Sequence, residues 1–300
     1  MNFLLLDKIG VIDRGILATI VDSEGHTYKK KGEKALFAVD DPYPVCGNLG
    51  SLCVDQHIML QGREAFAEGK PRLVTIDTSD KSDIHFGYGT FCGGKLQILL
   101  EPLTESYKIA YAKARGYLEA NQPFYVGHDV KISRLSVTPS PPQRRAGLFV
   151  ESIPASTKLF IFGATPLAQD IITTLRDTAF KVHIVDWRPD YLARFDSVAT
   201  LLVDKKPYPF DDNSFVLLIS HGFEKDKEAL GSALSAGCAY VGLLSSTSRR
   251  DMMYEDLERE GVSKKDLAKV SSPIGIDIGG RLDTEIAISV AAELVRSKNR

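Results

Sequence analysis

Cysteine is scarce in this chain, and its spacing argues against two kinds of structural site. The four cysteines, Cys46, Cys53, Cys92 and Cys238, are few for a disulfide framework in 300 residues. No Cys-x-x-Cys pair occurs, so the usual building block of a structural zinc site is missing. The chain is therefore expected to fold in a reducing compartment without disulfides or structural zinc.

Long apolar runs and an excess of one charge are also absent. The opening MNFLLLDKIG has too short an apolar run for a signal peptide or a membrane span, so a first strand or helix is predicted there, in a soluble, cytoplasmic protein. A net charge of −2 gives no indication of nucleic acid or an anionic membrane as a partner. Three hundred residues, 44% of them hydrophobic, predict two domains with a core each.

The most informative stretch runs from Lys158 to Arg188, and its pattern predicts a strand, a tight turn, a helix and a second strand. An apolar run over 159–162 ends at Gly163, an apolar stripe with helical spacing begins at Ala168, and a second apolar run over 182–185 ends at Asp186. A glycine turn followed about 20 residues later by an acid is typical of a dinucleotide-binding Rossmann unit, where the acid holds a ribose hydroxyl.

The glycine fingerprint of this turn is altered. The pattern Gly-x-Gly-x-x-Gly/Ala is represented by Gly163, Thr165 and Ala168, so threonine stands where the middle glycine is expected. That glycine lets a pyrophosphate approach the backbone closely, and Pro166 removes one amide donor from the helix start. A Rossmann-like unit is predicted with two hypotheses for its turn: a dinucleotide site weakened by Thr165, or an empty or altered pocket.

Further candidate binding residues follow the predicted strands of this half. Asp186 is either a ribose ligand or a plain strand-end aspartate, and Trp187 and Arg188 come next, at the strand end where open α/β sheets bind ligands. His221 follows the apolar run FVLLIS and is either an acid–base or ligand-facing group or a turn residue. Asp226, five residues on, is a candidate to orient it or simply the start of the next helix.

A second glycine-rich segment, SSPIGIDIGGR at residues 271–281, precedes the last predicted helix. Gly275, Asp277 and Gly279 make it a candidate phosphate or cofactor loop, although a tight structural crossover needs similar residues. The helix itself is predicted to begin at Asp283 or Thr284, both of which are good N-caps.

Two cysteines of the first third lie in glycine-bearing turns. Cys92 stands before Gly93 and Gly94, and Cys53 lies where a loop meets a helix start, which lowers the pKa of a thiol. A thiolate there suits a transition metal or a sulfur-transfer step, whereas the alternative is a buried small hydrophobe. Cys46 and Cys238 are predicted as packing residues.

The pattern as a whole predicts an α/β protein in which a smaller α+β domain precedes a Rossmann-like, doubly wound parallel sheet. The predicted boundaries are residues 1–135 for the first domain and 156–300 for the second. Between them, 136–155 contains the proline-rich, basic stretch SVTPSPPQRRAG and is predicted as a linker or long surface loop.

These motifs together resemble the XdhC/CoxI family of xanthine dehydrogenase accessory proteins over nearly the whole chain. SSPIGIDIGG with the following TEIAIS is similar to the family's terminal signature, and FIFGATPLAQ, VDWRPDYLARF and YVGLLSSTSRR resemble blocks of its Rossmann domain. FCGGKLQILLEPL and NLGSLCVD resemble its amino-terminal domain. The chain departs from the family pattern at Thr165, at Ser245, and at Ser51, Leu52 and Asp55 around the first cysteine loop.

The resemblance implies an accessory role. Family members are chaperones that bind the molybdenum cofactor, molybdopterin, assist its sulfuration with a cysteine desulfurase, and deliver it to apo xanthine dehydrogenase or a related hydroxylase. By this resemblance Cys53 and Cys92 become candidate thiolates for the cofactor's molybdenum, and a homodimer is expected. Two alternatives remain open: an NAD(P)-dependent oxidoreductase, based on the α/β domain and His221, and a binding or regulatory module that has lost cofactor chemistry, based on Thr165 and the altered Cys53 loop.

Overall fold

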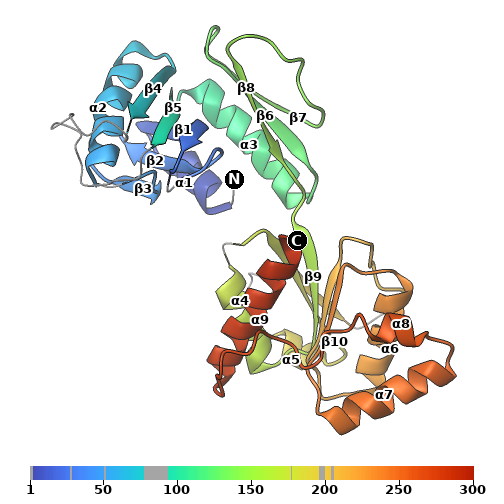
Figure 1. Cartoon of the computed structure of the whole chain (residues 1–300). Coiled ribbons are helices and arrows are strands. Elements are labelled where there is room, and N and C mark those ends of the chain that lie inside the picture. The colour runs from blue at the N-terminus through green and yellow to red at the C-terminus, as the bar shows by residue number, and fades with distance from the viewer. Residues whose placement is uncertain are drawn as a thin grey trace. The chain divides into compact units, whose positions relative to one another are not determined.

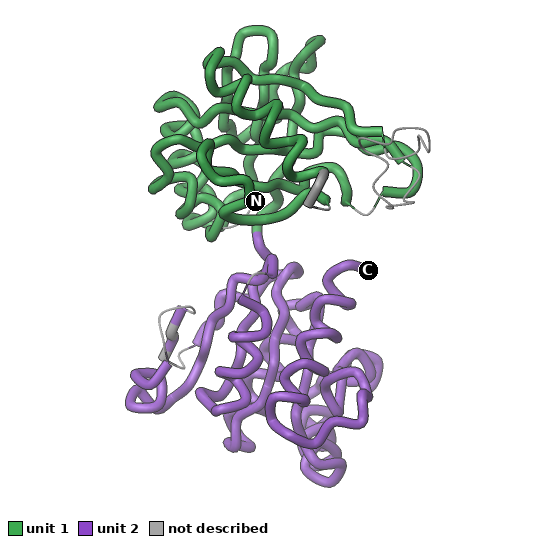
Figure 2. Tube along the Cα trace, turned by 90° about the vertical axis from the view of Figure 1, so that its left-hand side faces the viewer, with its two compact units in different colours: residues 1–155 green, residues 156–300 purple. Residues whose placement is uncertain are grey.

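The structure, a computed structural model, describes residues 3–27, 29–50, 52–77, 94–176, 178–195, 200–203 and 206–300. The chain forms two units, residues 1–155 and 156–300 (Figure 2), and each has its own hydrophobic core.

The first unit is built on an antiparallel five-stranded sheet in the order β3-β2-β1-β5-β4, with a separate three-stranded sheet in the order β7-β6-β8 (Figure 1). Its elements are α1 (Phe3–Val11), β1 (Gly15–Gly25), β2 (Lys34–Ala38), β3 (Pro44–Gly47), α2 (Leu52–Glu68), β4 (Arg72–Asp77), β5 (Gly94–Pro102), α3 (Glu105–Glu119), β6 (Phe124–Asp129), β7 (Arg134–Thr138) and β8 (Leu148–Ile153).

Both faces of the five-stranded sheet are covered, which is why the first seven residues of β1 are all buried. Ile16 and Ile20 face a core shared with α2, whereas Leu17 belongs to a second core shared with α1, α3, β6 and β7. Successive residues of a strand point to opposite faces, so a strand buried on both sides needs apolar residues at every position.

The segment expected as a linker is instead part of the first unit. β7 includes residues 136–138 and β8 covers most of 148–155, and both strands pair with β6 in antiparallel register. Only the proline-rich stretch between them is a loop, and it connects the two outer strands of the sheet, which lie on either side of β6. With these strands included, the α+β unit is the larger of the two rather than the smaller.

The second unit is a parallel five-stranded sheet in the order β11-β10-β9-β12-β13. Its elements are β9 (Thr157–Phe162), α4 (Pro166–Leu175), β10 (Phe180–Asp186), α5 (Pro189–Leu192), β11 (Thr200–Val203), β12 (Phe215–Leu218), α6 (Phe223–Ser235), β13 (Tyr240–Leu243), α7 (Thr247–Arg259), α8 (Lys264–Leu267) and α9 (Asp283–Lys298).

Helices cover both faces of this sheet, as doubly wound folds require. α4 and α9 pack together on one face, and α6, α7 and α8 cover the other (Figure 1). The order of the strands reverses between β9 and β12, and ligands of open α/β sheets bind in the crevice outside the carboxyl ends of the strands at such a point. The predicted Rossmann-like unit is therefore present, with its candidate site at this edge.

Candidate functional site

The loops after β9 and β12 touch at the point where the strand order reverses. Gly163 follows β9 with φ +114°, and a Cβ at this position would lie 2.9 Å from both the backbone nitrogen and the Cα of Ser220. Glycine is required here for two reasons, because other residues rarely adopt this φ and no side chain fits against the neighbouring backbone. The first predicted glycine thus sets the close approach of the two loops that border the crevice.

Thr165 caps the helix that begins at this crevice. Its backbone is extended, and its Oγ1 accepts a hydrogen bond from the Ala168 amide at 3.2 Å. Pro166 occupies the first helical position and has no amide hydrogen. Two of the donors that a phosphate would meet at a helix start are therefore missing or already used, in agreement with a weakened anion site.

Asp186, the candidate ribose ligand at the end of β10, is engaged within the chain. Its buried carboxylate accepts hydrogen bonds from the Ala164 amide at 2.8 Å and the Arg188 amide at 2.9 Å, and two more from the Arg188 guanidinium at 2.9 and 2.8 Å. Burial alone would raise the pKa of Asp186, but these donors hold it below its ordinary value. A ribose would have to displace Arg188 to reach the carboxylate.

The rings of Trp187 and Tyr191 lie against the guanidinium of Arg188. The guanidinium carbon lies 3.8 Å from the ring centroid of Tyr191 and 4.7 Å from that of Trp187. The Trp187 indole also packs on the next loop, because a Cβ at Gly222 would lie 2.8 Å from it. The ring that was a candidate to flank an adenine thus bridges the ends of β10 and β12.

His221 lies exposed in the loop after β12, and the hydrogen bonds of the Asp226 carboxylate go to Ser220 and Arg249. The buried Asp226 carboxylate accepts a hydrogen bond from the Ser220 hydroxyl at 2.6 Å and pairs with Arg249 of α7 at 2.8 Å. Burial is the largest influence on this carboxyl and raises its pKa to about 6. Of the two hypotheses for Asp226, the structure supports the start of a helix: Asp226 lies in the first turn of α6 and ties the β12 loop to α7.

The glycine-rich segment 271–281 packs against α9. A side chain at Gly275, where φ is +99°, would collide with the Ser289 hydroxyl, and the Gly275 amide donates to Glu293. Farther along, the exposed Asp277 accepts a hydrogen bond from the Gly279 amide at 3.1 Å. Gly275 is needed for the packing of this segment on α9, and Asp277 stabilises a turn. These contacts support the hypothesis that the segment is a tight structural crossover.

The first-unit candidates are only partly described. Cys92 and Gly93 lie outside the described residues, and of Cys53 only the backbone, in the first turn of α2, is described. Gly94 opens β5, where a Cβ would lie 2.6 Å from the Glu24 carbonyl oxygen. Within the described part of the chain, no three His, Cys, Asp or Glu side chains group as a metal site. The role of Cys53 and Cys92 as thiolate ligands of molybdenum stays a prediction.

Asp55, two residues after Cys53, has a buried carboxyl. The residue is 4% exposed, and its Oδ1 has no hydrogen-bond partner among the described residues. Burial raises the pKa of this carboxyl, partly offset by the Leu49 amide and the charge of Lys29. Buried polar atoms are nearly always paired, so this oxygen beside the cysteine loop is a position where a polar ligand group would fit.

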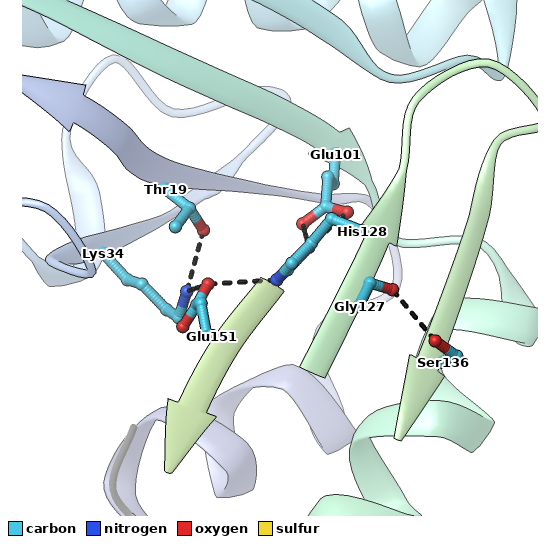
Figure 3. A network of polar contacts seen from close by, with 7 residues as sticks. All are labelled: Thr19, Lys34, Glu101, Gly127, His128, Ser136 and Glu151. Atoms are coloured by element: carbon cyan, nitrogen blue, oxygen red, sulfur yellow. Dashed lines mark hydrogen bonds and ion pairs between the residues drawn. The ribbon is translucent and has the colours of Figure 1, made fainter. Parts of the chain in front are cut away.

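A buried ionic network, which was not predicted from the sequence, joins the two sheets of the first unit (Figure 3). Nδ1 of His128 lies 2.8 and 2.9 Å from the two carboxylate oxygens of Glu101, and its Nε2 lies 3.0 Å from Glu151. Lys34 contacts Glu151 at 2.5 Å and donates to the Thr19 hydroxyl at 3.0 Å. Two acids and two bases thus balance, although they come from four different strands.

The two carboxylates keep His128 charged. Burial lowers the pKa of His128, but the charge of Glu101 and the hydrogen bonds that the ring donates to both carboxylates outweigh it and raise the pKa to about 9. Burial likewise opposes ionisation of Glu151, yet Lys34 and His128 lower its pKa to about 2. The side chain of His128 is 1% exposed, so a substrate does not reach it, and the network acts as a polar link between the sheets.

The engaged state of Asp186 leads to a prediction for the nucleotide turn. Thr165→Gly restores the glycine fingerprint at a cost of a few tenths of a kcal/mol in capping. We expect no gain of NAD binding, because Arg188 and the Ala164 amide still occupy the Asp186 carboxylate. Thermal unfolding with and without NAD is the measurement. A gain approaching the roughly 2.7 kcal/mol expected at 100 times the dissociation constant would contradict this interpretation.

Comparisons with known proteins agree across both units. Residues 159–294 match the XdhC Rossmann domain, and residues 13–77 match the XdhC and CoxI family. The chain is similar to a Bacillus subtilis protein named as a probable xanthine dehydrogenase component, at 24% identity over 96% of this chain and 94% of that protein. It is also similar to the Escherichia coli molybdenum cofactor insertion chaperone PaoD, at 23% identity over 93% of this chain and 82% of that protein.

A solved structure supports the fold. A crystal structure of a Bacillus halodurans protein named as a xanthine dehydrogenase superposes with a TM-score of 0.81 at 24% identity, covering 99% of this chain and 95% of that one. No helix within the described ranges is both long and apolar enough to span a bilayer.

Proposed function

Because the chain belongs to the XdhC and CoxI family, we propose that it is an accessory protein that binds the molybdenum cofactor and inserts it into a molybdenum hydroxylase of the xanthine dehydrogenase type. The observation that carries this proposal is the similarity to the insertion chaperone PaoD along 93% of the chain, across both units. Sulfuration of the cofactor with a cysteine desulfurase, a cytoplasmic location and a homodimeric state are further parts of the proposal.

The cysteine loops of the first unit are the proposed cofactor site. When bound, the cofactor supplies a molybdenum centre that accepts thiolate ligands, and Cys53 and Cys92 are the residues proposed to provide them. The amide of Gly93 would donate to the anionic part of the cofactor. The Oδ1 of Asp55, which has no partner among the residues that the structure describes, supports this location, because it would accept a hydrogen bond from a donor of the bound pterin.

The second unit is proposed to support this role without a tightly bound NAD(P). The Arg188–Asp186 pair and the Thr165 cap leave the crevice with few groups for a ribose or a pyrophosphate. The alternative of an NAD(P)-dependent oxidoreductase gains no support from this geometry. A direct measurement of molybdenum cofactor binding distinguishes our proposal from the alternative of a module that has lost cofactor chemistry.

Titration with molybdenum cofactor released from a molybdoenzyme tests the proposal. We expect the wild type to bind it and Cys92→Ala and Cys53→Ala to bind at least about tenfold more weakly, a loss of about 1.4 kcal/mol. Cys238→Ala is the matched control, because burial raises the pKa of that thiol to about 11 and makes it a packing residue. Binding is read from the fluorescence of the oxidised pterin, and transfer from reactivation of the apo-hydroxylase.

The outcomes of this titration separate the competing hypotheses. Equal affinity in the wild type and both cysteine variants would remove the thiolate assignment but keep a chaperone. No binding by the wild type would favour the module without cofactor chemistry.

A further inference from the structure

The buried carboxylate of Asp55 is held on one side only. Asp55 lies in the first turn of α2, and one of its oxygens accepts a hydrogen bond from the amide of Leu49, in the loop before the helix. The other oxygen, Oδ1, has no hydrogen-bond partner among the residues that the structure describes. Lys29, whose charge acts on this carboxyl, pairs with Glu33 at 3.0 Å. Because buried polar atoms are nearly always paired, Oδ1 indicates a donor from outside the described residues.

The molybdenum cofactor offers hydrogen-bond donors to a carboxylate at its pterin end. Its phosphate and its dithiolene are anionic, so a carboxylate repels them. The pterin carries N–H donors, among them an amino group and a ring N–H that lie side by side on the outer edge of the pyrimidine. An ionised carboxylate can only accept hydrogen bonds. This edge of the ring is therefore the part of the cofactor that fits Oδ1 of Asp55.

On the basis of the proposed function, we propose that Asp55 selects the ring of the cofactor, with Oδ1 accepting a hydrogen bond from the amino group on the pyrimidine edge. A ring with a carbonyl oxygen in place of that amino group would set two acceptors against each other in a buried place. Sites that hydrogen-bond an N–H of their ligand reject analogues that lack it far more strongly than apolar pockets reject a missing methylene. Asp55 thus determines which ring is accepted, in addition to the thiolates proposed to hold the metal.

Equilibrium dialysis with two ring analogues tests this role of Asp55. Pterin carries the amino group, whereas lumazine carries a carbonyl oxygen at the same position, and neither has a dithiolene or a phosphate. We expect the wild type to bind pterin at least about tenfold more tightly than lumazine. Both rings fluoresce, so the free and the bound amounts are read from their emission.

Asp55→Asn is expected to reverse this preference. The variant keeps the size of the side chain, but the Leu49 amide must face the new carbonyl oxygen, so the NH2 group takes the place of Oδ1. A donor at this place suits the carbonyl oxygen of lumazine and opposes the amino group of pterin. Asp40→Asn is the matched control, because it removes the same charge from a side chain of the same unit that is 74% exposed. It should keep the preference of the wild type.

A second variant covers the case in which Asp55→Asn fails to fold, which far-UV circular dichroism would detect. Asp55→Glu keeps a carboxylate, so it should retain the preference for pterin at reduced affinity. Equal binding of the two rings by the wild type, retention of neither, or a folded Asp55→Asn with the preference of the wild type would overturn the inference. Titration of the wild type with the whole cofactor separates this result from a failure of the proposed function. A wild type that binds the cofactor without preferring pterin to lumazine keeps the chaperone and loses the role of Asp55.

Discussion

Replacing Glu151 with alanine is expected to lower the free energy of unfolding of the first unit by about 3–5 kcal/mol, the usual cost of removing one partner from a buried ion pair. Glu151 accepts from both Lys34 and His128, so its loss leaves two buried cations facing the single carboxylate of Glu101. Guanidinium unfolding followed by far-UV circular dichroism is the measurement. Trp187, the only tryptophan of the chain, lies in the second unit, and its fluorescence reports that unit separately.

An exposed ion pair in the same unit is the control. The Arg14 and Asp40 side chains also meet at 3.0 Å, but they are 57% and 74% exposed, so Asp40→Ala should cost less than about 1 kcal/mol. A Glu151→Ala effect no larger than that of Asp40→Ala would show that the network contributes nothing beyond a surface pair.

The same network should make the stability of the wild type depend on pH. The folded-state pKa of His128 is raised from 6.5 to about 9, so its contribution is complete below pH 6.5 and is lost as pH rises through 9. That shift corresponds to about 3 kcal/mol. The folded-state pKa of Glu151 is lowered from 4.5 to about 2, so its contribution is present above pH 4.5 and is lost as pH falls toward 2. The alkaline loss should be absent in His128→Leu.

The second unit was predictable from the sequence because its signals are local. Strands buried on both faces read as short apolar runs, and the turn at Gly163 and the helix after it follow within a dozen residues. The end of β10 was located correctly for the same reason. The ion pair between Asp186 and Arg188 was not predicted, although an arginine two residues after an acid at a strand end indicates such a pair.

The first unit was less predictable because its defining contacts are distant in the sequence. The network brings together residues from β1, β2, β5, β6 and β8, and no spacing rule connects them. The available signal was weak: Glu101 and His128 are ionisable residues inside otherwise apolar runs, which indicates buried partners without naming them. β7 and β8 were missed because they are short, partly exposed strands on either side of a proline-rich loop.

Gly163→Ala is expected to destabilise the second unit by about 3 kcal/mol or more, since it adds an unfavourable positive φ to a collision with backbone. The Cβ would meet the nitrogen and Cα of Ser220 at 2.9 Å, and backbone atoms have no rotamer with which to move away. Guanidinium unfolding followed by Trp187 fluorescence is the measurement. The native emission should also change, because Trp187 packs on Gly222 in the loop that must shift.

Gly237→Ala is the matched control for this substitution, because Gly237 also has a positive φ, +69°, but a Cβ there would meet nothing within 4 Å. Gly237→Ala should lower the free energy of unfolding by only about 1 kcal/mol, because it adds the unfavourable backbone conformation without a collision. The difference between the two variants isolates the contact between the β9 and β12 loops. If both variants lost the same free energy of unfolding, the two loops would separate easily and the crevice could open to admit a ligand. That result would favour the hypothesis of a dinucleotide site in the second unit.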